Sequence, residues 1–517
     1  MPRVVIDNRE VDVPQGSTLL DAARALGLDV PALCWREGCR PNTSCMVCLM
    51  KIAGGDKFVP SCATIAEDGM CVESETAEVR QARRTSLELL LSDHAGECRA
   101  PCQYACAFDT DVPRMIRHIA AGRVAEAAAI VREAMPLAAV LTRASPEVCE
   151  GACRRCAVDE AAAIGLLKQY VADHDLASPE PYEPPREPDS GKCVAIVGAG
   201  PAGLSAAYFL LLGGHACAVF DAKPAAGGIL LDLDEKQLPH DVLTREIARI
   251  EGLGARFELA TSIGSEPPLD ALRRDYDAVL IAVGKLESDS AEYLGLPASG
   301  GRLVVKQSTH ETEAPGVFAA GDVVRPRSHA VRAAANGKAA AACIDQYLRG
   351  DRVTKPAKLP NLKLGHPDAG EVAIMAAEAG QTPRVVPSAV SHGLSDEEAQ
   401  AEARRCLRCD CEHLGTCTLG KYAEEYGANA GRYRGQRRRR EERQYHPDIV
   451  YEPGKCILCG LCVQIAEQHG EELGLTFVGR GFDVRVAVPF DEPLAKALKR
   501  AARQCAEACP SGALALR

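Results

Sequence analysis

The chain shows two hydrophobic periods, and each predicts a different kind of element. Apolar and polar side chains alternate at the start, with Val4, Ile6, Val11 and Val13 as the apolar set, which predicts strands. Residues 18–26, 83–94 and 114–134 have the pattern of helices. Residues 193–197 and 217–221 are short apolar runs that predict buried strands, with a helix over 204–214 between them. A small β-rich domain, a helical domain and an α/β domain are therefore expected in that order.

Composition changes mark the boundaries between these regions. Residues 178–190 are rich in proline and charge, which is typical of a linker, and residues 352–400 are rich in proline and alanine before a polar helix over 395–405. We predict a β-grasp domain over 1–78, a helical cluster domain over 79–177 and a linker over 178–190. A Rossmann-like domain over 191–350, a linker with a cysteine segment over 351–448 and a ferredoxin-like domain over 449–517 would follow. The fold class is multidomain α/β and α+β.

Bulk composition excludes some functions. The 517 residues suffice for three or four domains, and the net charge of −11 argues against wholesale nucleic-acid binding. We interpret the basic run over 431–443 as a solvated loop or a subunit contact. The N-terminus has no apolar signal-peptide core, and no run approaches 18 apolar residues, so a cytoplasmic protein without a membrane span is expected.

Cysteine is the informative residue type. Of 24 cysteines, 21 fall into five blocks, at 34–71, 98–106, 149–156, 406–417 and 456–509. Clustered thiols in a reducing compartment favour metal binding over disulfides. Structural zinc is the main alternative, since it needs four ligands and no sulfide. The number and spacing of the blocks favour iron–sulfur clusters and electron transfer.

The first block has the spacing C-x10-C-x2-C-x13-C, formed by Cys34, Cys45, Cys48 and Cys62. This arrangement suits a [2Fe–2S] cluster, whereas a zinc ribbon usually has two C-x2-C pairs. The segment over 31–64 resembles the N-terminal domain shared by the large cluster-bearing subunit of respiratory complex I, iron-only hydrogenases and NAD-linked formate dehydrogenases. Cys39 and Cys71 lie outside the motif and are interpreted as spare thiols.

The second and third blocks lie in the helical region. They resemble the N-terminal cluster domain of the glutamate synthase small subunit and of dihydropyrimidine dehydrogenase, which holds two [4Fe–4S] clusters and needs eight ligands. The expected ligands are Cys98, Cys102, Cys106, Cys149, Cys153, Cys156 and His94.

The chain departs from that family pattern at one cysteine, whose position holds Ser145. Cys156 is the expected substitute, one helical turn beyond Cys153. His94 is included because complex I-type proteins bind a [4Fe–4S] cluster through a histidine at a comparable place; a capping or solvated histidine is the alternative. An eighth ligand would be Gln169, because the dihydropyrimidine enzyme uses a glutamine in this region. The local alignment equally places Lys168 at that glutamine's position, and both alignments stay open.

A nucleotide-binding fingerprint opens the α/β region. Gly198, Gly200 and Gly203 stand between a strand and a helix, and Asp221 follows 23 positions after Gly198. Further on, Gly228 and the segment 316–322 resemble the two FAD motifs of two-dinucleotide-binding flavoproteins. The resemblance implies FAD contacts at Gly228, Gly321 and Asp322 and at the N-terminus of a helix from Val331.

In the glutamate synthase relatives, an NADPH-binding Rossmann unit lies between the two FAD motifs. Here only 31 residues separate Gly284 from Gly316, while a nucleotide-binding βαβ unit needs about 30 residues by itself. The NADPH domain is therefore expected to be missing.

The last two blocks complete the set of expected clusters. The spacing of Cys406, Cys409, Cys411 and Cys417 favours a [4Fe–4S] cluster over zinc. Residues 450–517 resemble a two-cluster ferredoxin that has lost one cluster. Because the last cysteine of each run serves the other cluster, one complete site remains and Cys505 is left over. The ligands expected at the remaining [4Fe–4S] site are Cys456, Cys459, Cys462 and Cys509.

Together these motifs predict FAD, one [2Fe–2S] and three to four [4Fe–4S] clusters, with no catalytic residues of the chain's own. We expect an electron-transfer subunit of a multi-subunit oxidoreductase of hydrogenase, formate dehydrogenase or transhydrogenase type, electron-bifurcating complexes included. The resemblances imply an FMN- and NAD(H)-binding partner and a terminal redox subunit, with ferredoxin as a further partner. The alternatives are an NADPH-dependent reductase like the glutamate synthase small subunit, a zinc scaffold, and a subunit that binds NAD at Gly198.

Overall fold

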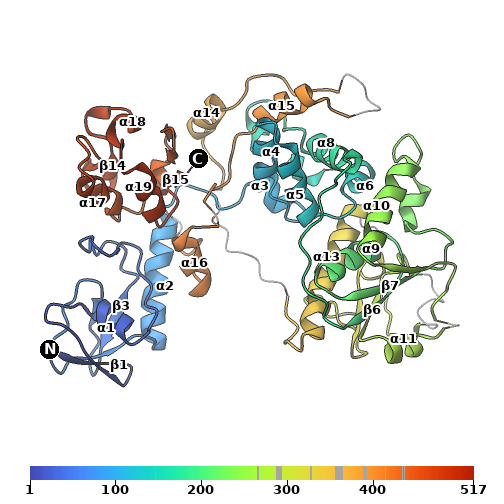
Figure 1. Ribbon diagram of the computed structural model, residues 1–517, viewed down its shortest axis with the longest axis horizontal. Helices are drawn as coiled ribbons and strands as arrows, with labels where there is room; N and C mark the ends of the chain where they lie inside the picture. The colour runs from blue at the N-terminus through green and yellow to red at the C-terminus, as the bar shows by residue number, and fades with distance from the viewer. Residues whose placement is uncertain are drawn as a thin grey trace. The chain divides into compact units, whose positions relative to one another are not determined.

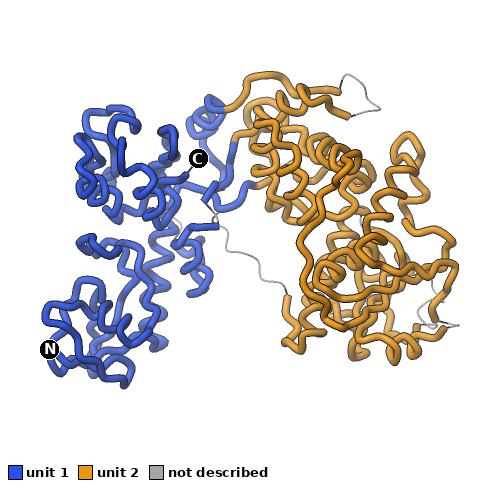
Figure 2. The backbone as a smooth tube through the Cα atoms, in the orientation of Figure 1, with its two compact units in different colours: residues 1–100, 359–378, 408–517 blue, residues 101–358, 379–407 orange. Residues whose placement is uncertain are grey.

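The computed structural model of the chain contains two compact units, drawn in separate colours in Figure 2. Unit 1 comprises residues 1–100, 359–378 and 408–517, and unit 2 comprises residues 101–358 and 379–407. The structure describes residues 1–145, 147–264, 267–286, 294–326, 329–355, 362, 365–387, 393–413, 415–433, 435 and 437–516. Each unit therefore combines segments that are far apart in sequence. The domain boundaries given above stay predictions.

A five-stranded mixed sheet begins unit 1, and its order is β2-β1-β5-β3-β4. Only β1 and β5 are parallel neighbours. Val4, Ile6 and Leu20 are buried beneath it, as the alternation predicted. The elements are β1 (Arg3–Ile6), β2 (Arg9–Asp12), α1 (Leu19–Ala25), β3 (Leu49–Ile52), β4 (Phe58–Pro60) and β5 (Cys71–Glu73). This arrangement confirms the predicted β-grasp fold.

The rest of unit 1 packs around a long helix, α2 (Ala77–Ser92), which Thr76 caps at its N-terminus. Two small antiparallel sheets follow, β11-β12-β15 and β13-β14. The elements are α14 (Ala369–Ala377), α16 (Thr418–Glu425), β11 (Gln444–Tyr445), β12 (Ile449–Tyr451), α17 (Leu461–Gln468), β13 (Thr476–Val478), β14 (Arg485–Ala487), α18 (Leu494–Ala497), α19 (Ala502–Ala508) and β15 (Leu514–Leu516).

Unit 2 begins with short helices, visible in Figure 1. The predicted helical stretch over 114–134 is interrupted at Gly122, which has a φ of +72°. The helices are α3 (Pro101–Ala105), α4 (Val112–Ala120), α5 (Val124–Ala134), α6 (Ala138–Ala144), α7 (Val148–Gly151), α8 (Ile164–Ala177) and α15 (Asp396–Arg404). The polar helix predicted near residue 395 is α15, and Ser395 caps it.

A parallel sheet with the order β10-β9-β6-β7-β8 forms the remainder of unit 2. Its central strands are buried along most of their length, which is typical of a sheet covered on both faces. The elements are β6 (Cys193–Val197), α9 (Pro201–Leu212), β7 (Ala216–Phe220), α10 (His240–Gly252), β8 (Arg256–Glu258), α11 (Leu269–Asp275), β9 (Ala278–Ile281), β10 (Val317–Ala319) and α13 (Ala330–Leu348). This is the predicted Rossmann-like domain. Among the described residues, no helix is long and apolar enough to cross a membrane.

Candidate metal and nucleotide sites

The four cysteines of the first block lie together in the β-grasp domain. The Cys34 thiol interacts with those of Cys45 and Cys62, and Cys62 also interacts with Cys48. All four side chains are buried. Hydrogen bonds among these thiols lower the pKa of Cys34 to about 2 and raise the pKa of Cys45 and Cys62. Four convergent buried thiols are a donor set that fits a [2Fe–2S] cluster.

The C-terminal cysteines form a second group in unit 1. Cys456, Cys459 and Cys509 each influence the Cys462 thiol, whose pKa burial raises. Backbone N–H groups of Leu458 and Leu514 donate to Cys456 Sγ and Cys509 Sγ, both at 3.4 Å. Amide donors of this kind stabilise thiolate sulfur. The predicted ligands therefore fit a [4Fe–4S] cluster.

The position of the lost ferredoxin cluster is filled with apolar side chains. Ala466 and Ala502, which replace two cysteines, are buried in the core of unit 1 together with Leu498. The Cys505 thiol is fully buried and donates to the Cys462 carbonyl at 3.5 Å. The side chains here thus form part of a packed apolar core.

The loops that carry these two cysteine groups bind each other directly. Asn42 donates through Nδ2 to the Leu458 carbonyl at 3.2 Å. Gln464 accepts from the Arg40 N–H at 2.7 Å and donates to the Arg40 carbonyl at 2.9 Å. Cys34, Cys45, Cys459 and Cys462 share one hydrophobic core. The two candidate cluster sites are therefore neighbours.

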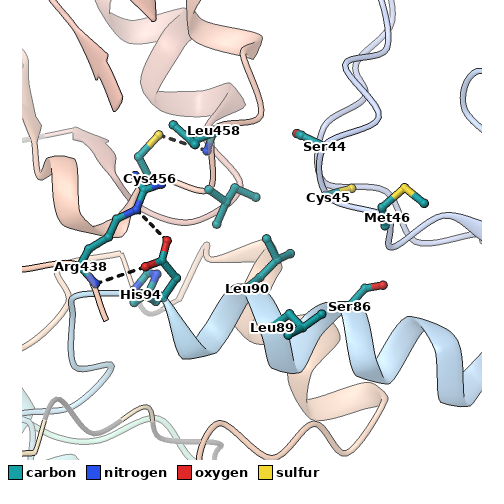
Figure 3. A pocket seen from close by; sticks show the side chains of 12 residues that line it. Ser44, Cys45, Met46, Ser86, Leu89, Leu90, His94, Arg438, Cys456 and Leu458 are labelled. Atoms are coloured by element: carbon teal, nitrogen blue, oxygen red, sulfur yellow. Dashed lines mark hydrogen bonds and ion pairs between the residues drawn. The ribbon is translucent and has the colours of Figure 1, made fainter. Parts of the chain in front are cut away.

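A cavity of about 290 Å³ separates the loops on one side. Figure 3 shows Cys45 and Cys456 on opposite sides of it, with Leu89 and Leu90 of α2 along its floor. Asp93 and Arg438 close one end with an ion pair of 2.7 Å. The lining is mixed, with Asp93 and His94 among its polar residues and Leu89 and Leu90 among its apolar ones.

A third group in unit 1 joins residues that are more than 300 positions apart in sequence. The Cys411 N–H donates to the Cys98 carbonyl at 3.3 Å. Cys98 and Cys411 both influence the pKa of Cys417, which burial raises to about 12. His94 is buried in the same unit, and its Nδ1 has no hydrogen-bond partner among the described residues. Desolvation and the Lys455 charge lower its pKa to about 3, so the imidazole is neutral, as a metal ligand must be.

The candidate ligands of the helical region are divided between the two units. His94 and Cys98 lie in unit 1, whereas Cys102 to Cys156 and Cys406 lie in unit 2. Arg155 donates to the Gly380 and Arg405 carbonyls at 2.9 and 2.8 Å, and Arg405 donates to the Glu160 carbonyl at 2.9 Å. Both guanidinium groups are buried. These bonds hold the segment that precedes Cys406 against the turn that carries Cys153 and Cys156.

Helix α8 places Lys168 and Gln169, the two candidates at the eighth-ligand position, in different surroundings. Lys168 points toward Cys106 and Cys149, with Nζ 3.8 and 3.6 Å from their sulfurs. Gln169 points elsewhere, because a Cβ on Gly393 would lie 3.4 Å from its Nε2. Throughout the described ranges, no three His, Cys, Asp or Glu side chains are arranged for a single metal ion.

The glycine fingerprint forms a close backbone cradle in unit 2. A Cβ on Gly203 would lie 1.9 Å from the Gly198 carbonyl oxygen, and one on Gly228 would lie 2.8 Å from Gly200 Cα. Helix α9 begins after Gly200 without a side-chain cap, so its N-terminal amides are available to a phosphate. Asp221 at the end of β7 accepts from the Ala199 N–H at 2.7 Å, which fixes its carboxylate beside the cradle. These features fit a dinucleotide.

The second motif lies at the start of η3 (Gly321–Val323) and α13. A Cβ on Gly321 would lie 2.8 Å from Ala202 Cβ, which packs this motif onto α9. The Gly321 N–H donates to Asn336 Oδ1 at 2.8 Å, and the Val331 N–H donates to Ser145 Oγ at 3.1 Å. The two predicted FAD motifs therefore meet in one site.

Models of known domain families match four regions of the chain. Residues 3–77 match the 2Fe-2S iron–sulfur cluster binding domain, and residues 74–179 match dihydropyrimidine dehydrogenase domain II with its 4Fe-4S cluster. Residues 196–250 match the NAD(P)-binding Rossmann-like domain, and residues 241–337 match the pyridine nucleotide-disulphide oxidoreductase domain. Residues 3–179 and 196–337 thus match models of iron–sulfur and nucleotide-binding oxidoreductase domains. The predicted [2Fe–2S], [4Fe–4S] and FAD-type domains are thereby confirmed, while the number of clusters stays a prediction.

Curated relatives have similar segments. The chain is 41% identical over 207 residues to the NADP(+)-dependent formate dehydrogenase subunit beta of Moorella thermoacetica, covering 36% of this chain and 29% of that one. It is 38% identical over 191 residues to the NADPH-Fe(3+) oxidoreductase subunit beta of Geobacter sulfurreducens, covering 36% and 28%. It is 34% identical over 207 residues to the glutamate synthase [NADPH] small chain of Escherichia coli, covering 38% of this chain and 43% of that one. The chain thus spans well under half the length of these relatives.

Among solved structures, an NAD+-reducing [NiFe]-hydrogenase in the H2-reduced state aligns over 100% of this chain and 87% of its own. The identity is 13% and the TM-score is 0.36, values at which a common fold is not established.

Proposed function

We propose that the chain is an iron–sulfur flavoprotein subunit that relays electrons within a multi-subunit cytoplasmic oxidoreductase. The supporting observation is the direct bonding of the Asn42 and Gln464 side chains across the two cluster loops of unit 1. Short separations between redox centres are what an electron relay requires. The relay would connect a partner that binds FMN and NAD(H) with a terminal catalytic subunit, and ferredoxin is a further candidate partner.

In unit 1, we assign three sites to three sets of residues. Cys34, Cys45, Cys48 and Cys62 would hold the [2Fe–2S] cluster, and Cys456, Cys459, Cys462 and Cys509 a [4Fe–4S] cluster. A third [4Fe–4S] site would use a neutral histidine with three thiolates. The bond between Cys411 and Cys98, and the buried unpartnered Nδ1 of His94, support this third set. Its members are His94, Cys98, Cys411 and Cys417.

In unit 2, we assign a further [4Fe–4S] site and the flavin. The bonds made by Arg155 and Arg405 support a site built from Cys102, Cys153 and Cys406, with Cys156 as the fourth candidate. The cradle at Gly198 and Gly228 would hold FAD. FAD supplies the exchange between two-electron and one-electron chemistry. Asp221 would bind a ribose hydroxyl, and the amides at the start of α9 would bind the pyrophosphate.

The protein environment would tune these groups in known ways. Burial and amide donors to sulfur set cluster reduction potentials, and both are present at Cys456 and Cys509. We assign substrate conversion to partner subunits, because the sites predicted on this chain are all electron carriers.

The proposal is tested by purifying the chain anaerobically with its partners and measuring EPR spectra during reduction. Signals from a [2Fe–2S] cluster and several [4Fe–4S] clusters, with an oxidised flavin spectrum before reduction, are expected. A colourless, zinc-containing protein without flavin would refute it. Identification of the co-purified partners would define the overall reaction.

A second candidate is an NAD(P)H-dependent reductase like the glutamate synthase small chain. It is favoured by the match of residues 196–250 to an NAD(P)-binding domain and by relatives whose names include NADP or NADPH. Isothermal titration of the full chain with NADPH and with NADH separates the two functions. Micromolar binding would support this second candidate, and no binding would support the relay.

A further inference from the structure

Helix α8 carries a buried lysine beside two cysteines in the helical part of unit 2. Lys168 is only 2% exposed. Its Nζ lies 3.6 Å from Cys149 Sγ, 3.8 Å from Cys106 Sγ and 3.1 Å from Glu147 Oε2. The three partners come from α7, the residue before it and the turn after α3. A single ammonium group is thus the common contact of both thiols.

Glu147 supplies the carboxylate beside the lysine, and its neighbours hold it in place. Glu147 Oε2 also accepts a hydrogen bond from Cys149 Sγ at 3.0 Å. A Cβ on Gly165 would lie 2.4 Å from Glu147 Cγ, so the glycine one turn before Lys168 provides the space for this side chain. The ion pair stays buried with little solvent access, and buried charges in proteins are normally compensated in this way.

This arrangement does not fit a cluster. A [4Fe–4S] cluster takes four electron-pair donors, and an ammonium group has three donor hydrogens and no acceptor. The Lys168 ammonium group also lies within 3.8 Å of both sulfurs, so the two thiols face a cation. Ser145 stands at the family's cysteine position. Its Oγ accepts a hydrogen bond from the Val331 N–H at 3.1 Å and so contacts the start of α13.

We infer that Lys168 and Glu147 have replaced the second [4Fe–4S] cluster of the helical domain, and that Cys106 and Cys149 are not cluster ligands. Unit 2 then holds one [4Fe–4S] cluster, and the chain holds three rather than four. The buried ion pair takes over the structural role of the absent cluster by joining α3, α7 and α8. The inference rests on the proposed iron–sulfur function and specifies its cofactors.

The test is the iron and acid-labile sulfide content of the anaerobically purified full chain, compared with two variants. We expect about 14 iron atoms per chain in the wild type, from three [4Fe–4S] clusters and one [2Fe–2S] cluster. The Cys106→Ser/Cys149→Ser double variant is expected to keep all of them, with unchanged EPR signals. The matched control Cys153→Ser, four residues along from Cys149, is expected to lose about four iron atoms.

The outcomes separate this inference from the proposed function. A wild-type content of about 18 iron atoms, or the loss of about four from the double variant, would overturn the inference while leaving the electron relay in place. Iron near zero with several zinc atoms would overturn the relay itself. The wild-type count is decisive even where a variant does not fold.

Discussion

Arg132 joins the helical part of unit 2 to its Rossmann-like part, and its removal gives the clearest test of how the two are held together. Its Nε lies 2.7 Å from Asp175 Oδ2, and its Nη1 lies 2.7 Å from Glu246 Oε2. Arg132 is on α5, Asp175 on α8 and Glu246 on α10. All three side chains are 2–3% exposed. The triad therefore fixes the cluster-bearing helices against the nucleotide-binding fold.

The structure allows the cost of Arg132→Met to be estimated. Asp175 would keep Arg249 at 3.0 Å and the Tyr182 N–H at 2.7 Å, so it remains paired. Among the described residues, Glu246 would keep only the Ala139 N–H at 2.9 Å, which leaves its buried carboxylate without a cation there. Removing one member of a buried ion pair costs about 3–5 kcal/mol. Neutralising the remaining carboxylate with Glu246→Gln in the same chain should recover about half of that loss.

The assay is urea unfolding of the holoprotein, followed by flavin release and circular dichroism. Arg273→Met is the matched control in unit 2, because its pair with Asp270 is 36% and 82% exposed and such pairs contribute about 0–1 kcal/mol. We expect Arg132→Met to lower the free energy of unfolding of unit 2 by several times the control's effect. Equal effects for the two variants would refute the assignment of Arg132 as the central contact.

Three further predictions concern single sites. Asp221→Ala should weaken FAD binding at least tenfold in fluorescence titration, since the carboxylate is fixed at the cradle by the Ala199 N–H; unchanged affinity would contradict the flavin assignment. Gly203→Val should abolish flavin binding, because its Cβ would lie 1.9 Å from the Gly198 oxygen, whereas Gly213→Ala, with its nearest contact at 3.4 Å, should bind flavin normally. Arg437 lowers the pKa of Glu371 from 4.5 to about 2, so its stabilisation is present above pH 4.5 and is lost as the pH falls towards 2. Glu371→Gln should therefore flatten this part of the acid-unfolding curve, and an unchanged curve would count against the pair.

Local patterns were sufficient to predict the two five-stranded sheets. The alternation at Val4 and Ile6 predicted the β-grasp strands, and the glycines at 198–203 predicted the turn between β6 and α9. In both cases the signal lies within a few residues, where side-chain period and backbone geometry act directly. Periodicity did not predict the break at Gly122. This glycine has a left-handed backbone conformation and divides the stretch over 114–134 into two helices.

The grouping of the cysteines was beyond local patterns. Cys98 meets Cys411 only because residues 408–517 fold back onto the N-terminal region, and no nearby residue signals a contact of that sequence separation. The choice between Lys168 and Gln169 also needed the structure. Adjacent residues on a helix point about 100° apart, so the packing of α8 through Leu167 and Val171 decides which one faces Cys149.

The central claim is that clusters and flavin on this chain exchange electrons. The most direct measurement is stopped-flow mixing of the anaerobic holoprotein with reduced methyl viologen, followed at cluster and flavin wavelengths. We expect the flavin to be reduced through the clusters. Cys153→Ser, which removes the proposed cluster of unit 2, should slow this reduction markedly. Flavin reduction at the same rate in that variant, or clusters that are reduced while the flavin stays oxidised, would contradict the account.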